Sequence, residues 1–297
     1  MSPTKRNLPE RRIARKTRLG AAKPAFAGPG HTAVQVVGAD RLSETDPFVL
    51  LMDDRLDFRP GQPVGEAHPH AGLETVTLML DGELNDSAFG PLRAGDVEWM
   101  TAGRGVVHSE DVKAAGRARV LQLWLMLPQS ERDSEPELQI VPLAMVPIRR
   151  EPGVEARLYS GRSGALVSPT RNRVPTTIAD FRFEPNASVT QALSGGWTAF
   201  VYVIEGTVQI GGEAVEAGEV AWLDRTEANE TIVSFRGGSA GGRAVFYAGE
   251  PQKEPIVTRG PFVAGSEAEL SARFAAYRSG AFQRLTDIPV SIRSTAI

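Results

Sequence analysis

Three of the four histidines in the sequence fall in two short motifs that could bind a metal ion. His68 and His70 flank a proline in HPHAGLE, and His108 precedes Glu110 by two residues in GRGVVHSED. Side chains two residues apart on an extended strand point to the same face. If the two motifs lie on neighbouring antiparallel strands, three imidazoles and one carboxylate converge on one point. Taken alone, a His-x-His pair could also be two polar side chains at the start of a strand.

This set of ligands suits Fe(II), Mn, Ni, Cu or Zn, and it leaves coordination positions open for water or substrate. The sequence does not choose among these metals. Metal binding needs neutral imidazoles, so an activity at this site should fall on acidification. The fourth histidine, His31, is interpreted as structural or exposed.

Three further residues could lie beside these ligands. Glu74 lies an even number of residues after His68 and His70, so its side chain could point to the same face as these ligands. It could instead form a salt bridge at the rim of a barrel. Gln122 and Trp124 alternate on the apolar stretch LQLW, so both could line a pocket. A plain core role suits Trp124 equally well.

A fourth candidate lies in the loop TAGRG, residues 101–105. Gly103 and Gly105 allow a positive φ, so the loop can pass tightly by the mouth of a barrel. Arg104 could bind an anionic substrate there, or it could brace the loop, and we favour bracing.

Composition narrows the function classes. The absence of cysteine excludes disulfides, a thiol nucleophile, a Cys-ligated zinc site and an iron–sulfur cluster. The net charge of −3 gives the chain no broad nucleic-acid-binding signature. No apolar stretch is long enough to span a bilayer, and the N-terminus does not resemble a secretory signal. We expect no membrane association, no direct nucleic-acid binding and a cytoplasmic location.

The first 30 residues differ from the rest, since they hold eight Lys or Arg and one acid, Glu10. They could form a nucleic-acid-binding arm or a transit peptide. Phe26 is the one aromatic residue available for stacking on a base. We therefore expect residues 1–30 to be a solvated, flexible segment.

Short apolar runs bounded by glycine and proline predict a mainly β chain. The runs are HTAVQVVG, PFVLLM, ETVTLML, RVLQLWLML, AFVYVIEG and AVFYAG. Residues 265–282 instead show a helical period, with a capping box at Ser266 and Glu269 and a stop at Gly280. The sequence thus predicts an all-β fold with a short C-terminal helix.

A hairpin pattern occurs twice, in LMLDGELNDSAFGPLRAGDVEWM (78–100) and YVIEGTVQIGGEAVEAGEVAWL (202–223). Both copies have three apolar residues, an acid and a glycine, then a polar hairpin and Ala-Gly-acid-Val-x-Trp. The repetition predicts two jelly-roll β-barrel domains, residues 31–145 and 146–297, with the helix in the second. The Pro-rich stretch 128–153 is the expected linker.

The second domain lacks the ligands of the first. Aligning Gly206 on Gly82 places Ala192 and Ser194 where His68 and His70 stand. No histidine follows residue 108, so the second domain cannot build the same site. We expect it to serve as a packing partner, with RGPFV and the C-terminal helix closing over the first barrel.

The segments HPHAGLETVTLMLDGEL, AGDVEWMTAGRGVVHSE and LQLWLMLP resemble the pirin family, two-domain members of the cupin superfamily. So do DPFVLL upstream and AGEPQKEPIVTRGPFVAGSEAEL near the C-terminus. In pirins the metal is usually iron, held by three histidines and one glutamate of the N-terminal cupin. Carried over by position, the resemblance implies that these are His68, His70, His108 and Glu110.

The resemblance also implies a function. Several pirins resemble quercetin 2,3-dioxygenases, so we expect an Fe(II)-dependent dioxygenase that opens a flavonol-like enol, with Glu110 as the catalytic base. The alternative is a non-enzymatic, iron-dependent, redox-sensing regulatory protein that binds a transcription factor or a metabolic enzyme. A metal-dependent isomerase acting on a sugar or keto acid is a third possibility, against which the pirin motif argues.

Three features depart from the family pattern. Ala71 stands where the residue after the second histidine is usually arginine, which we place at the pocket entrance. The hairpin between Gly82 and Gly95 is shorter than in many pirins, and the basic residues 1–30 have no counterpart. These departures bear on substrate preference and partner contacts rather than on the metal ligands.

Overall fold

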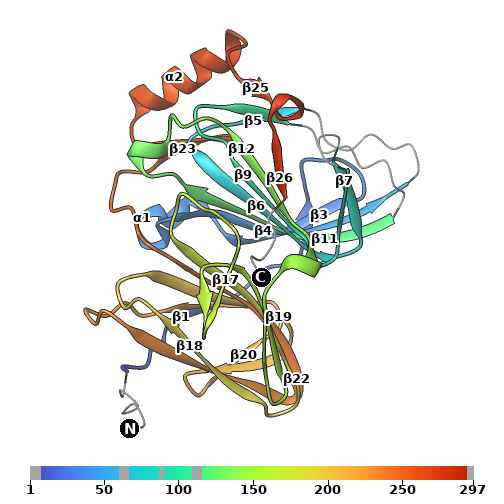
Figure 1. The fold of residues 1–297 in the computed structure, drawn as a ribbon, viewed down its shortest axis with the longest axis vertical. Helices are drawn as coiled ribbons and strands as arrows, with labels where there is room; N and C mark the ends of the chain where they lie inside the picture. The colour runs from blue at the N-terminus through green and yellow to red at the C-terminus, as the bar shows by residue number, and fades with distance from the viewer. Residues whose placement is uncertain (1–7, 60–66, 87–89, 109–115, 293–297) are drawn as a thin grey trace. The chain divides into compact units, whose positions relative to one another are not determined.

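A computed structural model describes residues 8–59, 67–86, 90–108 and 116–292 (Figure 1). Most of these residues lie in β-strands, as the sequence predicts. The chain forms two compact units, each assembled from segments far apart in the sequence. The histidine unit contains residues 20–146, 169–175 and 252–297, and the second unit contains residues 1–19, 147–168 and 176–251.

An eight-stranded sheet forms the main wall of the histidine unit. Its strands are hydrogen-bonded in the order β2-β3-β4-β11-β6-β9-β12-β26. In that order they span Lys23–Pro24, His31–Val37, Phe48–Phe58, Gly116–Met126, Leu73–Asp81, Val97–Thr101, Glu137–Val141 and Val290–Ile292. Neighbouring strands pair antiparallel, except that β12 and β26 are parallel.

Smaller sheets and helices complete the histidine unit. One sheet joins β25 (Gln283–Arg284), β10 (Val106–His108) and β5 (His68–His70) in that order. The pairs β7–β8 (Glu83–Asp86, Gly90–Arg93) and β23–β24 (Val257–Arg259, Phe262–Ala264) form two more. The α-helices are α1 (Leu42–Thr45) and α2 (Glu267–Arg278), and the 3-10 turns are Ala39–Arg41, Gln129–Glu131, Leu143–Met145 and Leu285–Asp287.

The predicted C-terminal helix is present as α2, capped as expected. The Ser266 hydroxyl accepts a hydrogen bond from the Glu269 backbone N–H at 3.2 Å. Leu270 of α2 is buried in a cluster with Ala71, Phe262 and Ala264. Figure 1 shows α2 at the same end of the histidine unit as β5 and β25. By its contacts the helix belongs to the histidine unit, although its residues fall within the expected second domain, 146–297.

The second unit is built on a nine-stranded sheet. Its main path is β1-β21-β19-β22-β17-β14-β13, with β18 paired to β22 and β20 paired to β19. On that path the strands span Ile13–Arg18, Glu219–Leu223, Thr198–Ile210, Thr231–Gly249, Thr176–Phe183, Val154–Ser160 and Ile148–Glu151. The two added strands are β18 (Ser188–Leu193) and β20 (Glu213–Glu216), and a separate pair joins β15 (Arg162–Ser163) to β16 (Leu166–Val167).

The two copies of the hairpin pattern adopt matching structures. Strands β6 and β9 pair antiparallel in the histidine unit, and β19 and β21 pair in the same way in the second unit. The turn glycines match too: φ is 75° at Gly82 and 64° at Gly206, and 92° at Gly95 and 81° at Gly218. Glycine adopts positive φ angles more readily than any other residue, so the shared glycines mark equivalent turns.

The N-terminal residues differ most from expectation. Residues 8–30, expected to be part of a flexible segment, contribute strands to both units. Strand β1 pairs along the edge strand β21. The buried guanidinium of Arg11 donates to the carbonyls of Ser194, Gly195 and Trp197 at 3.1–3.2 Å. An open sheet edge has unpaired backbone groups, so pairing with β1 satisfies hydrogen bonds that β21 would otherwise leave unmade.

No helix in the described ranges is long and apolar enough to cross a membrane.

Candidate metal centre

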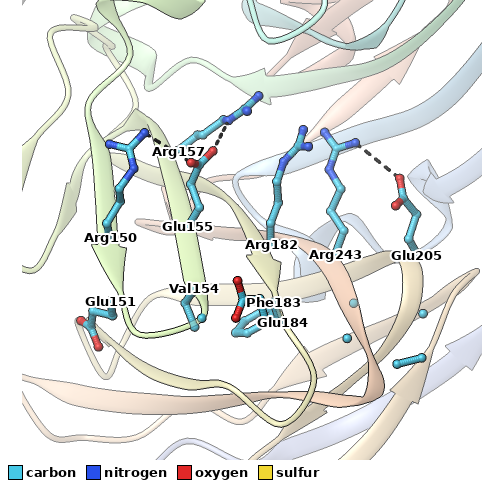
Figure 2. A pocket seen from close by; sticks show the side chains of 15 residues that line it. Arg150, Glu151, Val154, Glu155, Arg157, Arg182, Phe183, Glu184, Glu205 and Arg243 are labelled. Atoms are coloured by element: carbon cyan, nitrogen blue, oxygen red, sulfur yellow. Dashed lines mark hydrogen bonds and ion pairs between the residues drawn. The ribbon is translucent and has the colours of Figure 1, made fainter.

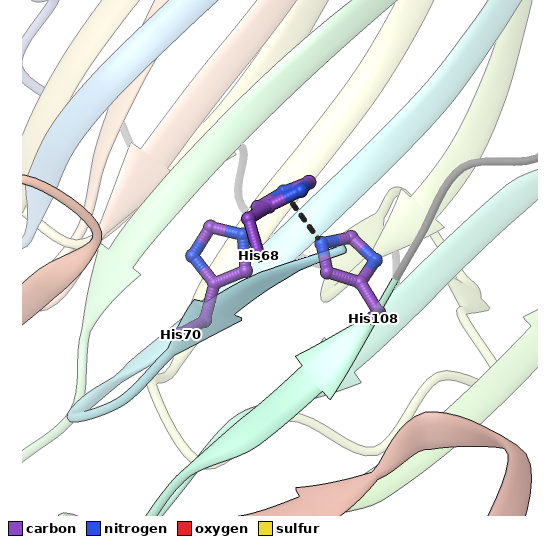
Figure 3. Close-up of side chains that lie close together, drawn as sticks. All are labelled: His68, His70 and His108. Atoms are coloured by element: carbon purple, nitrogen blue, oxygen red, sulfur yellow. Dashed lines mark hydrogen bonds between the residues drawn. The ribbon is translucent and has the colours of Figure 1, made fainter. Parts of the chain in front are cut away.

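The pairing of β5 with β10 brings the two histidine motifs together. The strands are antiparallel, and His68 lies directly opposite His108 while His70 lies opposite Val106. His68 and His70 are two residues apart on β5, so they share a face with the opposite residue His108. The three side chains point toward one another, as Figure 3 shows.

The distances within this cluster suit one metal ion. One ligand nitrogen from each histidine can be chosen such that all three lie within 4.8 Å of one another. The Nε2 atoms of His68 and His108 are 2.9 Å apart. Two nitrogens that bind one ion at about 2.1 Å, at a right angle to each other, lie about 3 Å apart. The same distance is that of a hydrogen bond between the two rings, so one of these nitrogens carries a proton that a bound ion would displace.

Burial keeps the imidazoles of His70 and His108 neutral. Burial, with smaller contributions from the neighbouring imidazoles of His108 and His68, lowers the pKa of His70 well below its ordinary value. Burial, reinforced by His68, lowers the pKa of His108 to about 3. Neutral imidazoles offer the lone pairs that a metal requires. Among the described residues, the buried Nδ1 atoms of His70 and His108 have no hydrogen-bond partner. His108 faces His68 through Nε2, so its Nδ1 atom lies on the far side of the ring from the converging nitrogens.

The fourth predicted ligand, Glu110, lies outside the described residues. Its role as ligand and as base stays a prediction.

The three histidines line a cavity of about 390 Å³ in the histidine unit. This volume lies in the range of small-molecule sites. Its remaining wall is mostly apolar, with a few polar side chains. The lining residues besides the three histidines are Phe26, His31, Asp54, Leu56, Thr77, Leu84, Val120, Gln122, Trp124, Gly260 and Pro261.

Gln122 and Trp124 lie in this wall, as the alternation of LQLW suggests. The Trp124 ring packs edge-on against His70, with ring centroids 5.0 Å apart. The Thr77 hydroxyl donates to the Gln122 side-chain carbonyl at 2.8 Å. Because that bond uses the oxygen of the amide, the Gln122 amide nitrogen is left to donate hydrogen bonds to a ligand.

Glu74 does not line the cavity. It is fully buried, and its carboxylate accepts hydrogen bonds from the Thr101 hydroxyl at 2.9 Å and from the backbone N–H groups of Arg173 and Val174 at 3.3 and 3.4 Å. Burial raises the pKa of Glu74 although these hydrogen bonds act to lower it. Glu74 therefore holds residues 173–174 against β6 and β9. This role differs from the two expected from the sequence, a position beside the metal ligands or a salt bridge at the rim of the barrel.

Arg104 braces its loop. Its half-exposed guanidinium forms an ion pair with Glu135 at 2.6 Å, and it is not among the residues that line the cavity. The backbone of the loop has the positive φ values expected at Gly103 and Gly105. The structure thus favours the bracing interpretation over a substrate contact.

Ala71 does not stand at the pocket entrance. Its side chain is buried, and its backbone forms a parallel bridge with Phe262. The preceding residues of the RGPFV segment, Gly260 and Pro261, line the cavity instead. The expected closure by this segment is thereby present, while Ala71 packs beneath it.

Sequence reasoning missed His31 and Asp54. His31 is buried and lies in the cavity wall, with its Nε2 atom 2.7 Å from Asp54 Oδ1. The exposed ring of Phe26 packs edge-on against both His31 and His68, at 5.3 and 5.5 Å. The sequence shows a histidine and an acid on predicted neighbouring strands. It does not show the strand register that brings the two side chains together.

The second unit offers a different pocket. It contains no histidine, and its cavity of about 730 Å³ is lined by arginines and glutamates (Figure 2). Glu155 pairs with Arg150 at 3.4 Å and with Arg157 at 3.0 Å, and Glu205 pairs with Arg243 at 3.6 Å. The charges on this wall therefore compensate each other, and the residues there do not form a metal site.

Comparison with known proteins gives consistent matches. A family model described as pirin matches residues 30–125, and one described as the pirin C-terminal cupin domain matches residues 178–283. The chain is 37% identical over 244 residues to Pirin-1 of Arabidopsis thaliana, covering 79% of this chain and 82% of that protein. It is 34% identical over 266 residues to human pirin, covering 85% and 88% of the two chains. The solved structure of a quercetin 2,3-dioxygenase from Acinetobacter baumannii matches with a TM-score of 0.82 and 28% identity, covering 92% of this chain and 98% of that chain.

Proposed function

The chain belongs to the pirin family, with two cupin domains, and from that premise we propose that its histidine unit is an Fe(II)-dependent dioxygenase of the quercetin 2,3-dioxygenase type. The observation that carries the proposal is the cluster of His68, His70 and His108 at the wall of a mostly apolar cavity. Similarity to the Acinetobacter baumannii protein supports the reaction type.

A bound metal would supply the Lewis-acid and redox chemistry that the oxidation of an enol by O₂ requires. The protein supplies the rest. His68, His70 and His108 would hold the ion, and we assign Glu110 as the fourth ligand and as the base that takes the enol proton. Fe(II) is the proposed metal, although the same ligands suit Mn, Ni, Cu and Zn.

The cavity wall suits a planar, largely uncharged substrate. Leu56, Leu84 and Val120 present apolar surface, and the Trp124 indole adds an aromatic face. No lysine or arginine lies among the described residues of this wall, which argues against a phosphorylated sugar or another strongly anionic substrate. The Gln122 amide nitrogen can orient a ligand oxygen. These features favour a flavonol-like enol over a sugar or keto acid.

The proposal is tested by loading the metal-free protein with Fe(II) under anaerobic conditions, adding a panel of flavonols, and then measuring oxygen uptake. We expect uptake in proportion to the flavonol consumed, and none in the His70→Ala protein treated identically. Full iron content without uptake on any flavonol would contradict the dioxygenase. That result would favour the alternative proposal, an iron-dependent regulatory protein that binds a protein partner.

A further inference from the structure

We propose that Asp54, held in place by His31, binds a ligand hydroxyl group remote from the metal, so that the cavity selects polyhydroxylated aromatic enols. This inference rests on the proposed function, because it concerns the substrate of the same cavity. The first support is strand register. On the paired strands β3 and β4, Ala33 lies opposite Asp54, and His31 is two residues from Ala33 on the same face. His31 and Asp54 are therefore diagonal neighbours that point into the cavity from the sheet.

The hydrogen bonds of His31 fix its tautomer. Its Nδ1 atom accepts the Ala27 backbone N–H at 3.1 Å, so Nδ1 carries no proton. The Nε2 atom of a neutral ring then carries the proton and donates it to Asp54 Oδ1 at 2.7 Å. Both ring nitrogens are in use, so His31 is not a fourth imidazole ligand. Its effect is to hold the Asp54 carboxylate in one orientation.

A carboxylate such as that of Asp54 is uncommon in the mostly apolar wall of a cavity. The Asp54 side chain is 14% exposed and stands in a wall with apolar neighbours such as Leu56 and Val120. A carboxylate in such surroundings is costly unless hydrogen-bond donors surround it. Within the described part of the chain, His31 is the one side chain that donates to it. A ligand hydroxyl that donates to Asp54 would supply a second donor.

The adjacent residue shows the contrast. Asp53 is also buried, on the opposite face of β4, and it receives two hydrogen bonds from the Arg119 guanidinium at 2.7 and 2.8 Å. A bidentate arginine satisfies a carboxylate fully, which is the usual structural arrangement. Asp54 has no bidentate arginine; among the described residues its Oδ1 atom accepts a hydrogen bond from the neutral His31 imidazole. The Asp54 side chain also faces a cavity large enough for a ligand.

The polar groups of the cavity imply the chemistry of its ligand. The metal ligands define one end, Gln122 offers a donor, and Asp54 offers a fixed acceptor. A phenolic hydroxyl is neutral, donates strongly, and lies in the plane of an aromatic ring that suits the apolar wall. An anionic substituent at the same place would meet the Asp54 carboxylate and be repelled.

The experiment compares quercetin with 3-hydroxyflavone, which has the same metal-chelating group but lacks the other hydroxyls. Dissociation constants are measured anaerobically on iron-loaded protein, so no turnover is needed. In Asp54→Asn, the amide still accepts from His31 but presents an NH₂ group in place of the second acceptor oxygen. We expect this change to weaken quercetin binding about 10- to 100-fold and to change 3-hydroxyflavone binding by less than about threefold. Asp57→Asn, an exposed carboxylate on the same strand, is the matched control and should change neither value.

Two outcomes overturn the inference, and they differ. If quercetin and 3-hydroxyflavone both bind, and Asp54→Asn affects them equally, Asp54 does not select hydroxyls and the proposed function stands. If neither compound binds the iron-loaded wild-type protein, the proposed substrate class fails, and the inference fails with it. Iron content and thermal unfolding of Asp54→Asn, compared with wild type, separate a binding effect from a folding effect.

Discussion

His68 and His108 lie directly opposite each other on the paired strands β5 and β10, with their Nε2 atoms 2.9 Å apart. Two short strands thus deliver the cluster, and no loop side chain is needed to bring these two nitrogens together. The backbone pairing places the two side chains opposite each other, so little rearrangement is needed for both to bind one ion. Such preorganisation lowers the cost of ordering the ligands on binding.

The first prediction concerns which histidines bind metal. Replacing His108 with Ala removes one of the three converging nitrogens, so metal affinity should fall more than about 100-fold. The matched control is His31→Ala, which removes an imidazole from the same cavity whose nitrogens are already bonded to Ala27 and Asp54. It should retain the metal content of the wild type. Elemental analysis of both proteins checks this, and full metal in His108→Ala would discredit the ligand assignment.

The second prediction concerns the stability of the metal-free protein against pH. The pKa values of His70 and His108 are lowered in the folded state, so the unfolded chain takes up protons first as the pH falls below about 6.5. Stability is therefore fully present above that pH. It is lost on acidification toward the folded pKa, about 3 for His108, at up to about 1.4 kcal/mol per pH unit for each histidine.

Urea unfolding of the metal-free protein between pH 7.5 and 4.5 measures this slope. The His108→Gln protein provides the comparison, since it lacks one of the two titrating groups and should show a shallower slope. Equal slopes in the two proteins would show that His108 takes up its proton without a cost to folding.

The sequence predicts the strands, the repeated hairpin and the shared face of His68 and His70, because each depends on residues close together in the chain. It does not predict which unit the termini join. The pairing of β1 with β21, and of Ala71 with Phe262, brings together residues about 200 positions apart, and no local pattern encodes such a pairing. The contact between His31 and Asp54 is not predictable for a related reason, since it depends on the register between β3 and β4. The position of Glu74 on its strand is readable from the sequence, but two of its hydrogen-bond partners, the backbone N–H groups of Arg173 and Val174, lie about 100 residues downstream.

The third prediction concerns Glu74 as a structural residue. Glu74→Ala leaves the Thr101 hydroxyl and the backbone N–H groups of Arg173 and Val174 without their buried acceptor, and it should lower the free energy of unfolding by about 2–4 kcal/mol. Metal content should stay that of the wild type. Arg104→Ala breaks an exposed ion pair and should cost less than about 1 kcal/mol. Loss of metal from well-folded Glu74→Ala would instead return Glu74 to the surroundings of the metal.

The fourth prediction concerns the C-terminal residues that complete the histidine unit. Strand β25 pairs with β10, which carries His108, and Phe262 covers Ala71 in a buried cluster with Leu270. A chain of residues 20–146 alone, which is the first segment of the histidine unit and includes the domain 31–145 expected from the sequence, exposes this apolar surface and leaves β10 with an unpaired edge. We expect it to be poorly folded and to bind metal weakly.

Circular dichroism and metal content of residues 20–146 check this, with the full chain as the control. A cooperative thermal transition together with full metal binding in residues 20–146 would show that the C-terminal segments are dispensable.

The fifth prediction concerns Phe26 beside the cavity. Its ring is 70% exposed yet packs edge-on against both His31 and His68, so it links the hydroxyl-binding pair to the metal ligands. An exposed ring contributes little to folding, so Phe26→Ala should change the free energy of unfolding by less than about 1 kcal/mol. It removes an aromatic face from the cavity, and the affinity for quercetin and 3-hydroxyflavone should fall together, by about 3- to 10-fold. This equal loss distinguishes Phe26 from Asp54, whose replacement should affect quercetin alone. Val167→Ala, at another exposed apolar side chain in the second unit, should leave both affinities unchanged, and an unchanged affinity in Phe26→Ala would remove the ring from the binding surface.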